Sequence, residues 1–397
     1  MRTPQALLAV ACLPWAMGCT ASAEDVAASD SAALRAAISS AQPGTRILVA
    51  PGEYEGGMYF AKLRGTLDEP IVIAGADAGN PPEIVGGPSA FHFPDASHLV
   101  LQDLALRGAT GNGLNIDDGG SYDTPARGIV LRRLTVTDVG PTGNCDGIKL
   151  SGVDDLRVED CIIERWGDGG SAIDMVGCHS GLIQGCTFRG RDGVSGTGPQ
   201  MKGGTSDIVV RGNRFEDAGG RAVNIGGSTG LRFFRPSPQG YEAKGITVEG
   251  NVILGSMGAI AFVGVDGAVV RHNTIYVPGK WAIRILQETR SPDFVPCRNG
   301  VFSDNIVVFR SDRWSEGGCN IGPDTDPGSF RFERNLWHCL DRPEASRPSL
   351  PTPESDGIVG EAPMFVDAEG GDFRLMAGSP ADGKGYTSLP EAHAPGP

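Results

Sequence analysis

A short strand-like pattern recurs along most of this chain, and it restricts the possible folds more than any other feature. The pattern reads apolar-x-Val/Ile-x-x-(Cys/Asn)-x-apolar, as in RVEDCII, VVRGNRF and VVRHNTI. Its sixth position is filled in successive copies by Leu104, Leu134, Cys161, Cys186, Asn213, Asn251, Asn273, Asn305 and Asn335, at intervals of 22 to 38 residues. Each copy has the length and alternation of a β-strand and is bounded by turn residues. A recurring unit made only of short strands predicts a right-handed parallel β-helix in which each repeat is one coil.

Equivalent residues of successive coils should form columns, because neighbouring strands stack about 4.8 Å apart. The five asparagines of the pattern are therefore expected to form a ladder in which side-chain amides hydrogen-bond from coil to coil. Cys161 and Cys186 would continue this column as buried thiols. We expect the column to be structural rather than catalytic.

A second pattern places one polar residue between two apolar residues, as in GIKLS, AIDMV and AVNIG. Period-two alternation directs that middle side chain away from the core. The predicted outward column contains Asn115, Lys149, Asp174, Lys202, Asn224, Ala261, Arg284 and Asn320. One face of the solenoid should therefore carry a row of lysines around Asp174.

Composition agrees with one elongated all-β domain. The chain has 397 residues, of which 59 are glycine, and a net charge of −14. This charge argues against nucleic acid or a membrane surface as a partner, but a local row of Lys and Arg could still bind an anionic polysaccharide. We expect a monomer with a capping helix at 24–44, the parallel β-helix at 45–340 and a C-terminal strap and tail at 341–397.

Residues 1–23 resemble a signal peptide, because the apolar run ALLAVACLPWAMG is too short to span a bilayer stably. Two processing sites compete: a small-x-small site that ends before Glu24, and a bacterial lipobox that ends at Cys19. The prediction is export to the periplasm, the outside of the cell or a lipid anchor on the outer membrane. Seven cysteines follow Cys19, and in an exported protein they could form disulfides. Their spacing does not indicate zinc.

Three insertions follow strands of the second pattern, at residues 117–127, 228–244 and 286–299. All three should leave the same edge of the outward column and could form the wall of a groove beside it. Arg232, Arg235 and Tyr241 are expected to line this groove, because Arg and aromatic side chains suit carboxylates and sugar rings.

The lysines of the outward column have two interpretations. Lys149, Asp174 and Lys202 could form a surface ion ladder that contributes little stability. Alternatively, they form a positive groove for the carboxylate of a uronate, with one lysine removing a proton. Arg221 would assist, and Arg284 would reach a neighbouring subsite.

The runs LRAAISSAQPGTRILVAPGEYEG, MKGGTSDIVVRGNRFEDAGG and GDFRLMAGSPADGKG resemble bacterial β-helix polysaccharide lyases of the chondroitinase B and alginate lyase type. The resemblance implies cleavage of an acidic polysaccharide by β-elimination, with Lys202 as the base. Lys149 and Arg221 would neutralise the substrate carboxylate. Asn224 stands where the family has an arginine, and it would bind substrate together with Asn115 and Arg284. Family members bind Ca²⁺, for which Asp146 and Asp174 are the candidate ligands.

Two other classes of function stay open. NCDGI and GDGGSAI resemble motifs of the polygalacturonase hydrolases, in which Asp146 and Asp168 would form an acid/base pair. Gly169 stands where that family has a second aspartate. The third alternative is a surface protein that binds glycans without cleaving them.

Overall fold

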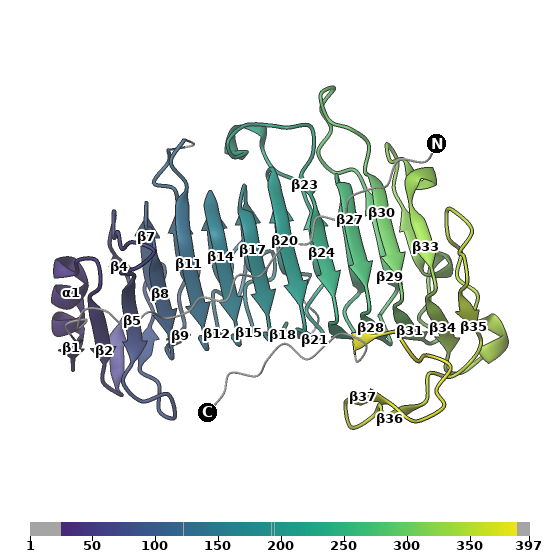
Figure 1. The fold of residues 1–397 in the computed structure, drawn as a ribbon, viewed down its shortest axis with the longest axis horizontal. Coiled ribbons are helices and arrows are strands. Elements are labelled where there is room, and N and C mark those ends of the chain that lie inside the picture. The colour runs from purple at the N-terminus through teal and green to yellow at the C-terminus, as the bar shows by residue number, and fades with distance from the viewer. Residues whose placement is uncertain (1–24, 122, 192, 194, 387–397) are drawn as a thin grey trace.

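The computed structural model describes residues 25–121, 123–191, 193 and 195–386. In this part of the chain, three long parallel β-sheets run side by side along one axis, and an α-helix lies at the N-terminal end (Figure 1). From β2 (Arg46–Val49) to β32 (Cys319–Ile321), each coil contributes one strand to each sheet. The predicted fold, a right-handed parallel β-helix in a single domain, is confirmed.

Sheet A is the longest and has 13 strands. In stacking order, its strands are β1 (Asp25–Ala28), β2 (Arg46–Val49), β5 (Ile71–Gly75), β8 (Leu99–Gln102), β11 (Ala126–Arg132), β14 (Val153–Glu159), β17 (His179–Gln184), β20 (Thr205–Arg211), β24 (Ile246–Glu249), β27 (Asp266–Arg271), β30 (Arg298–Ser303) and β33 (Arg331–Glu333), with β23 (Ala243–Lys244) beside β20.

Sheet B has 12 short strands and follows sheet A in every coil. Its strands are β3 (Glu53–Glu55), β6 (Glu83–Val85), β9 (Ala105–Arg107), β12 (Thr135–Thr137), β15 (Ile162–Glu164), β18 (Thr187–Arg189), β21 (Arg214–Glu216), β25 (Val252–Leu254), β28 (Thr274–Tyr276), β31 (Ile306–Phe309), β34 (Leu336–Cys339) and β35 (Ile358–Val359).

Sheet C has ten strands and carries the predicted outward column. Its strands are β4 (Met58–Tyr59), β7 (Phe91–Pro94), β10 (Leu114–Asp117), β13 (Ile148–Ser151), β16 (Ser171–Val176), β19 (Thr197–Lys202), β22 (Arg221–Gly226), β26 (Gly258–Val263), β29 (Trp281–Leu286) and β32 (Cys319–Ile321).

The N-terminal end of the solenoid is covered by α1 (Ser31–Ser40). Asp30 caps this helix by accepting a hydrogen bond from the backbone N–H of Ala33 at 2.8 Å. Leu34 and Ile38 are fully buried against the first coil. The helix is shorter than predicted, because residues 25–28 form β1 and pair in parallel with β2.

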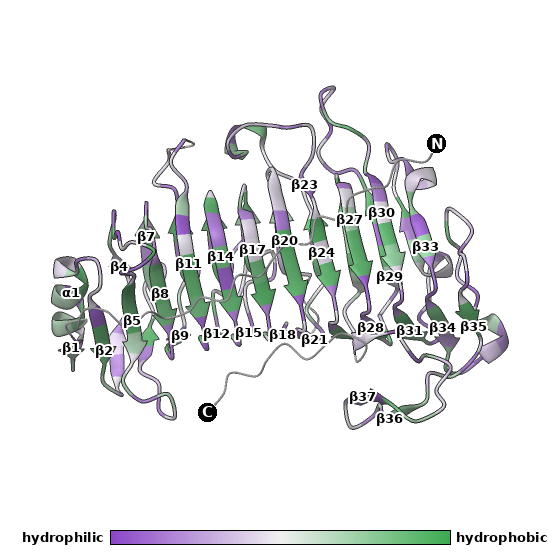
Figure 2. Ribbon diagram, in the orientation of Figure 1, coloured by the Kyte–Doolittle hydropathy of each residue, from purple (hydrophilic) through white to green (hydrophobic). Residues whose placement is uncertain are grey.

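The core fills the space between the three sheets, and green hydrophobic segments recur along the strands in Figure 2. Equivalent side chains stack from coil to coil: the rings of Phe188 and Phe215, for example, are parallel with centroids 4.9 Å apart. The predicted buried thiols, Cys161 and Cys186, lie in this core. All seven cysteines in the described residues are free thiols, so no disulfide joins these coils.

The asparagine ladder is confirmed at the turn between sheets A and B. Each amide Nδ2 donates to the Oδ1 of the next asparagine, at 3.0 Å from Asn213 to Asn251 and 2.8 Å from Asn251 to Asn273. The contacts continue to Asn305 and Asn335, both at 3.0 Å. Each Oδ1 also accepts a backbone N–H from the preceding coil. The ladder therefore satisfies the backbone polar groups of a buried turn.

Replacing Asn273 with alanine should lower the free energy of unfolding by about 2–4 kcal/mol, because it leaves several buried partners without a hydrogen bond. The groups left without a hydrogen-bond acceptor include the backbone N–H and the side-chain amide of Asn251. Urea denaturation followed by circular dichroism measures the change. The matched control is Asn80→Ala, an exposed asparagine, which should change stability by less than about 0.5 kcal/mol. Equal effects of the two substitutions would contradict a stabilising ladder.

Short 3₁₀ turns lie in the loops between strands: η1 (Leu231–Phe233), η2 (Glu316–Gly318) and η3 (Pro327–Ser329), with η4 (Pro343–Ala345) after β34. After the last coil, β36 (Phe365–Asp367) and β37 (Asp372–Leu375) form an antiparallel pair. Glu354 ends the ladder by accepting a 2.8 Å hydrogen bond from Asn335 Nδ2. No helix in the described part of the chain is long and apolar enough to cross a membrane. The predicted signal peptide and Cys19 lie outside the described residues.

Candidate active site

The outward column of sheet C is present, but Gln200 occupies the position predicted for Lys202. Strand register aligns the side chains of Tyr59, His92, Asn115, Lys149, Asp174, Gln200, Asn224, Ala261, Arg284 and Asn320. The prediction that Lys202 occupies this column was wrong. Gln200 is aligned with Asp174, and Lys202 lies two residues later, opposite Val176. Lys202 nevertheless extends from the same face, because alternate residues of a strand point the same way.

A four-residue cluster forms the chemical centre of this face, and we call Asp146, Lys149, Asp174 and Lys202 the lysine cluster. The ammonium of Lys149 donates a hydrogen bond to Asp174 Oδ2 and lies 3.6 Å from Asp146 Oδ2. The ammonium of Lys202 lies 3.1 Å from Asp174 Oδ1. Asp174 is almost completely buried, whereas 21% of the Lys149 side chain and 16% of the Lys202 side chain stay exposed. Two ammonium groups thus reach the groove above one buried carboxylate.

The two lysines are held differently. Asp174 Oδ1 accepts no hydrogen bond within the described residues, although Lys202 lies at ion-pair distance from it. The contact with Lys202 is therefore an ion pair without hydrogen-bond geometry. Lys149, in contrast, is fixed by a hydrogen bond to Asp174 and by the nearby Asp146. Lys202 is the member of the cluster whose N–H groups can turn toward a ligand.

Burial and neighbouring charges set the protonation of the cluster. Burial raises the pKa of Asp146 to about 6, and the negative charge of Asp174 acts in the same direction. For Lys149, burial alone would lower the pKa, but the carboxylates of Asp174 and Asp146 outweigh it and raise the pKa. Lys149 is therefore a permanent cation at neutral pH.

Arg221 extends the positive surface from β22. Its Nη1 donates to Asn224 Oδ1 at 3.1 Å, and its Nη2 pairs with Glu288 from the third insertion. Asn224 itself is fully buried, and its Nδ2 donates to the carbonyl of Gly226 at 3.3 Å. The predicted contact between Asn224 and a substrate is thus blocked in this conformation, and the amide positions Arg221 instead.

The three insertions form a connected wall along one edge of sheet C, and the two longest stand out above the strands in Figure 1. Arg235 of the second insertion pairs with Asp118 of the first. Phe234 packs edge-on against Phe294 of the third insertion, with ring centroids 5.4 Å apart. The backbone N–H of Val295 donates to the carbonyl of Gly240 at 2.9 Å. The predicted wall is therefore present and is held by contacts between all three loops.

The predicted lining residues of the wall have different positions. Arg235 is largely buried in its pair with Asp118, and only 13% of its side chain is exposed. Arg232 stacks on its neighbour Phe233 at the exposed tip, 4.6 Å from the ring centroid. Tyr241 lies against Lys244 of sheet A. Whether Arg232, Arg235 and Tyr241 line a substrate groove therefore stays a prediction.

A glycine permits the second insertion to cross the strands. Gly177 follows β16 with a φ of +58°, and a Cβ at this position would lie 2.0 Å from the Cβ of Arg235. Any side chain there would push the loop away from the sheet.

The carboxylates predicted for a hydrolase are both held by turns. Asp146 accepts a hydrogen bond from the backbone N–H of Ser171 at 2.8 Å and is 1% exposed. Asp168 accepts a hydrogen bond from the backbone N–H of Gly143. Such contacts are expected where a carboxylate stabilises the entry to a strand.

The predicted calcium ligands face cations. Asp174 contacts Lys149 and Lys202, and Asp146 lies beside Lys149. The described residues contain no group of three or more His, Cys, Asp or Glu side chains arranged to hold a metal ion. Ca²⁺ needs six to eight oxygen ligands, so this donor set does not fit it.

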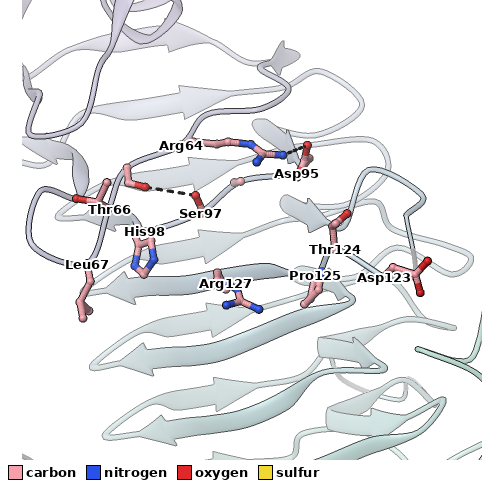
Figure 3. Close-up of a pocket in the computed structure, with 12 residues that line it drawn as sticks. Arg64, Thr66, Leu67, Asp95, Ser97, His98, Asp123, Thr124, Pro125 and Arg127 are labelled. Carbon is pink, nitrogen blue, oxygen red and sulfur yellow. Dashed lines mark hydrogen bonds and ion pairs between the residues drawn. The ribbon is translucent and has the colours of Figure 1, made fainter.

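A pocket of about 410 Å³ lies at the N-terminal part of the solenoid, beside the first insertion (Figure 3). Its walls include Arg64, which pairs with Asp95, together with His98 and Arg127. A second pocket, of about 530 Å³, lies under the third insertion. Neither pocket is lined by a residue of the lysine cluster, which lies on the outer face of sheet C.

Several residues of the groove were missed by sequence reasoning. Tyr59 and His92 begin the column, with their rings edge-to-face and centroids 5.0 Å apart. The Phe-His-Phe alternation around His92 matches the second pattern and could have revealed it. Gln200 was hidden because Pro199 and Gly198 precede it in place of the usual apolar residues. Glu288 belongs to a loop, where no sequence periodicity indicates which way its side chain points.

The fold and the outward column define a right-handed parallel β-helix protein with a row of polar side chains on one sheet. Residues 89–275 match the family model described as right handed beta helix region, in agreement with the resemblance seen in the sequence. No curated protein matches this chain.

Two solved structures illustrate the similarity. The alginate lyase from Paenibacillus sp. str. FPU-7 superimposes with a TM-score of 0.55 and 17% identity, over 75% of this chain and 99% of that one. The PL6 family polysaccharide lyase Pedsa3628 from Pseudopedobacter saltans gives a TM-score of 0.55 and 14% identity, over 92% and 99% of the two chains. At these identities the similarity establishes the fold, and the function must be argued from the site.

Proposed function

We propose that this protein binds an acidic, uronate-containing polysaccharide in the groove of sheet C and cleaves it by β-elimination. The observation that carries the proposal is the lysine cluster, in which Lys202 lies beside an incompletely satisfied Asp174 while Lys149 is fixed as a cation. The solved lyases with the same fold support the choice of reaction.

Elimination from a uronate has two chemical requirements. The carboxylate must be neutralised so that the neighbouring C5 proton becomes acidic, and a base must remove that proton. Lys149 and Arg221 supply fixed cations, since each is oriented by a hydrogen bond to an oxygen acceptor. Lys202 in its neutral form would take the C5 proton. The C4–O4 bond then breaks, a C4=C5 double bond forms, and the leaving oxygen takes up a proton, so no oxidant or reductant is needed.

Lys202 is assigned as the base rather than Lys149 because of their contacts. Lys149 contacts two carboxylates, and its raised pKa keeps it charged. Lys202 contacts one carboxylate, through a single ion pair. A group that must lose and regain a proton is expected to have fewer fixed partners.

The full chain should be incubated with alginate, pectate, chondroitin and dermatan sulfate, with added Ca²⁺ or with a chelator. A rise in ultraviolet absorbance from the new C=C bond would support elimination and identify the substrate class. New reducing ends without that absorbance would overturn it in favour of the hydrolase, in which Asp146 and Asp168 act. Binding without any cleavage would instead establish a glycan-binding protein.

Two further expectations are tested alongside this assay. Binding of Ca²⁺ stays a prediction from the family resemblance. Comparing the incubations with added Ca²⁺ and with a chelator tests it without assuming where the ion binds. Export also stays a proposal, because the residues that would direct it lie outside the described part of the chain. Mass determination of the protein recovered from cells would reveal cleavage before Glu24 or lipidation at Cys19.

A further inference from the structure

A second positive site lies in the same groove, on the C-terminal side of the lysine cluster. The guanidinium of Arg284, on β29, lies over the ring of Trp281, 4.5 Å from its centroid. Arg284 Nε donates a hydrogen bond to Asn320 Oδ1 at 3.0 Å. No carboxylate in the described residues forms an ion pair with Arg284, which is about half-buried.

The surroundings hold this guanidinium in one orientation. Asn320 Nδ2 donates to Glu316 Oε2 at 2.7 Å, and Trp281 Nε1 donates to the same oxygen at 3.1 Å. Glu316 thus fixes both residues that contact Arg284. Because Nε is used by Asn320, the terminal nitrogens are the donors left for a ligand, and their planar geometry suits a carboxylate.

A second guanidinium lies near the first. Ala261, which is fully buried, separates the strand positions of Arg284 and Asn224. The Arg284 side chain leans back over Gly258, where an added Cβ would lie 3.3 Å from Arg284 Cδ. Burial lowers the pKa of Arg284, the positive charge of Arg221 lowers it further, and the nearby carboxylates of Glu288 and Glu316 act in the opposite direction. An anion bound to the terminal nitrogens of Arg284 would favour its charged form.

We propose that Arg284 forms an anion subsite that binds the carboxylate of a uronate residue other than the one cleaved, whose carboxylate is assigned to Lys149 and Arg221. This inference rests on the proposed function and extends it to recognition of the polymer. Arg284 is three coils from Gln200 in strand register, which corresponds to about 14 Å at about 4.8 Å per coil. One carboxylate cannot reach both positions. The ligand is therefore an oligomer with anionic groups at two separate sugar residues.

The test compares Arg284→Gln with Arg331→Gln in the full chain. Arg331 is exposed on sheet A, so its replacement removes the same charge away from the groove. Binding of uronate oligomers, from disaccharides to hexasaccharides of the active substrate class, is measured by titration calorimetry, and KM and kcat are measured on the polymer. Arg284→Gln should weaken binding of the longest oligomers about tenfold and leave disaccharide binding unchanged. Arg331→Gln should leave both unchanged.

The kinetic readout separates the subsite from a catalytic role. A remote contact made equally in the ground state and the transition state raises KM and leaves kcat nearly constant. Equal weakening of all oligomer lengths, or a loss confined to kcat, would overturn the subsite while leaving the elimination proposal intact. Absence of binding by every oligomer to the unsubstituted protein would overturn both.

Discussion

Replacing Lys202 with alanine should lower the turnover number for elimination by about 100- to 10,000-fold, the range that a positioned general base contributes. The ammonium of Lys202 faces the groove and is held by one ion pair, at 3.1 Å from Asp174 Oδ1. Its loss removes the group that takes the substrate proton, while the strand hydrogen bonds of β19 are kept. The rate of absorbance increase on the polysaccharide identified in the substrate screen measures the effect.

Two control variants separate the role of the base from that of a cation. Lys202→Arg keeps the positive charge and can still pair with Asp174, but a guanidinium does not lose its proton at neutral pH. It should be as inactive as the alanine variant. Lys244→Ala removes an exposed lysine of sheet A and should retain full activity. Recovery of more than about a tenth of the rate, equivalent to about 1.4 kcal/mol of the barrier, in Lys202→Arg would show that the side chain acts only as a cation.

The features of the fold that repeat could be predicted from the sequence, because each coil imposes the same physical requirement. The buried turn after sheet A must satisfy backbone groups in every coil, so asparagine recurs there and the ladder from Asn213 to Asn335 is visible as a pattern. The insertions were located for a related reason, since they interrupt an otherwise regular spacing. Their common edge follows from the fixed direction of parallel strands.

Features that depend on local exceptions could not be predicted. Lys202 was placed in the column because Met201 precedes it, but the register of β19 is set by pairing with β16 and aligns Gln200 instead. A shift of two residues keeps the side chain on the same face, so the pattern alone cannot detect it. The pair between Arg235 and Asp118 joins residues 117 positions apart. Loop side chains have no periodicity from which such a contact could be inferred.

The sequence also left open whether the lysines form a solvated ion ladder on the surface or a binding site for a substrate carboxylate. The two alternatives differ in the burial of the carboxylate between them, which strand patterns do not report. Asp174 proves to be almost completely buried, whereas the lysines keep part of their surface exposed. A buried carboxylate shared by two ammonium groups is costly to disturb, and this cost provides a direct test.

Asp174→Asn should therefore lower the free energy of unfolding by about 3–5 kcal/mol, because it removes the carboxylate that offsets two partly buried ammonium groups. Urea denaturation followed by tryptophan fluorescence measures the change. Asp324→Asn is the matched control, because Asp324 is 61% exposed in a 3.3 Å pair with Arg290, and it should cost less than about 1 kcal/mol.

Adding Lys149→Met to Asp174→Asn should recover part of the lost stability, since one of the uncompensated ammonium groups is then absent. The double variant should stay inactive, because the proposed reaction needs the cation of Lys149 to neutralise the substrate carboxylate. A loss below about 1 kcal/mol for Asp174→Asn alone would instead match an exposed ion pair. The lysine cluster would then be a surface ion ladder, and the buried Asp174 could not be the element that positions Lys202 for proton removal.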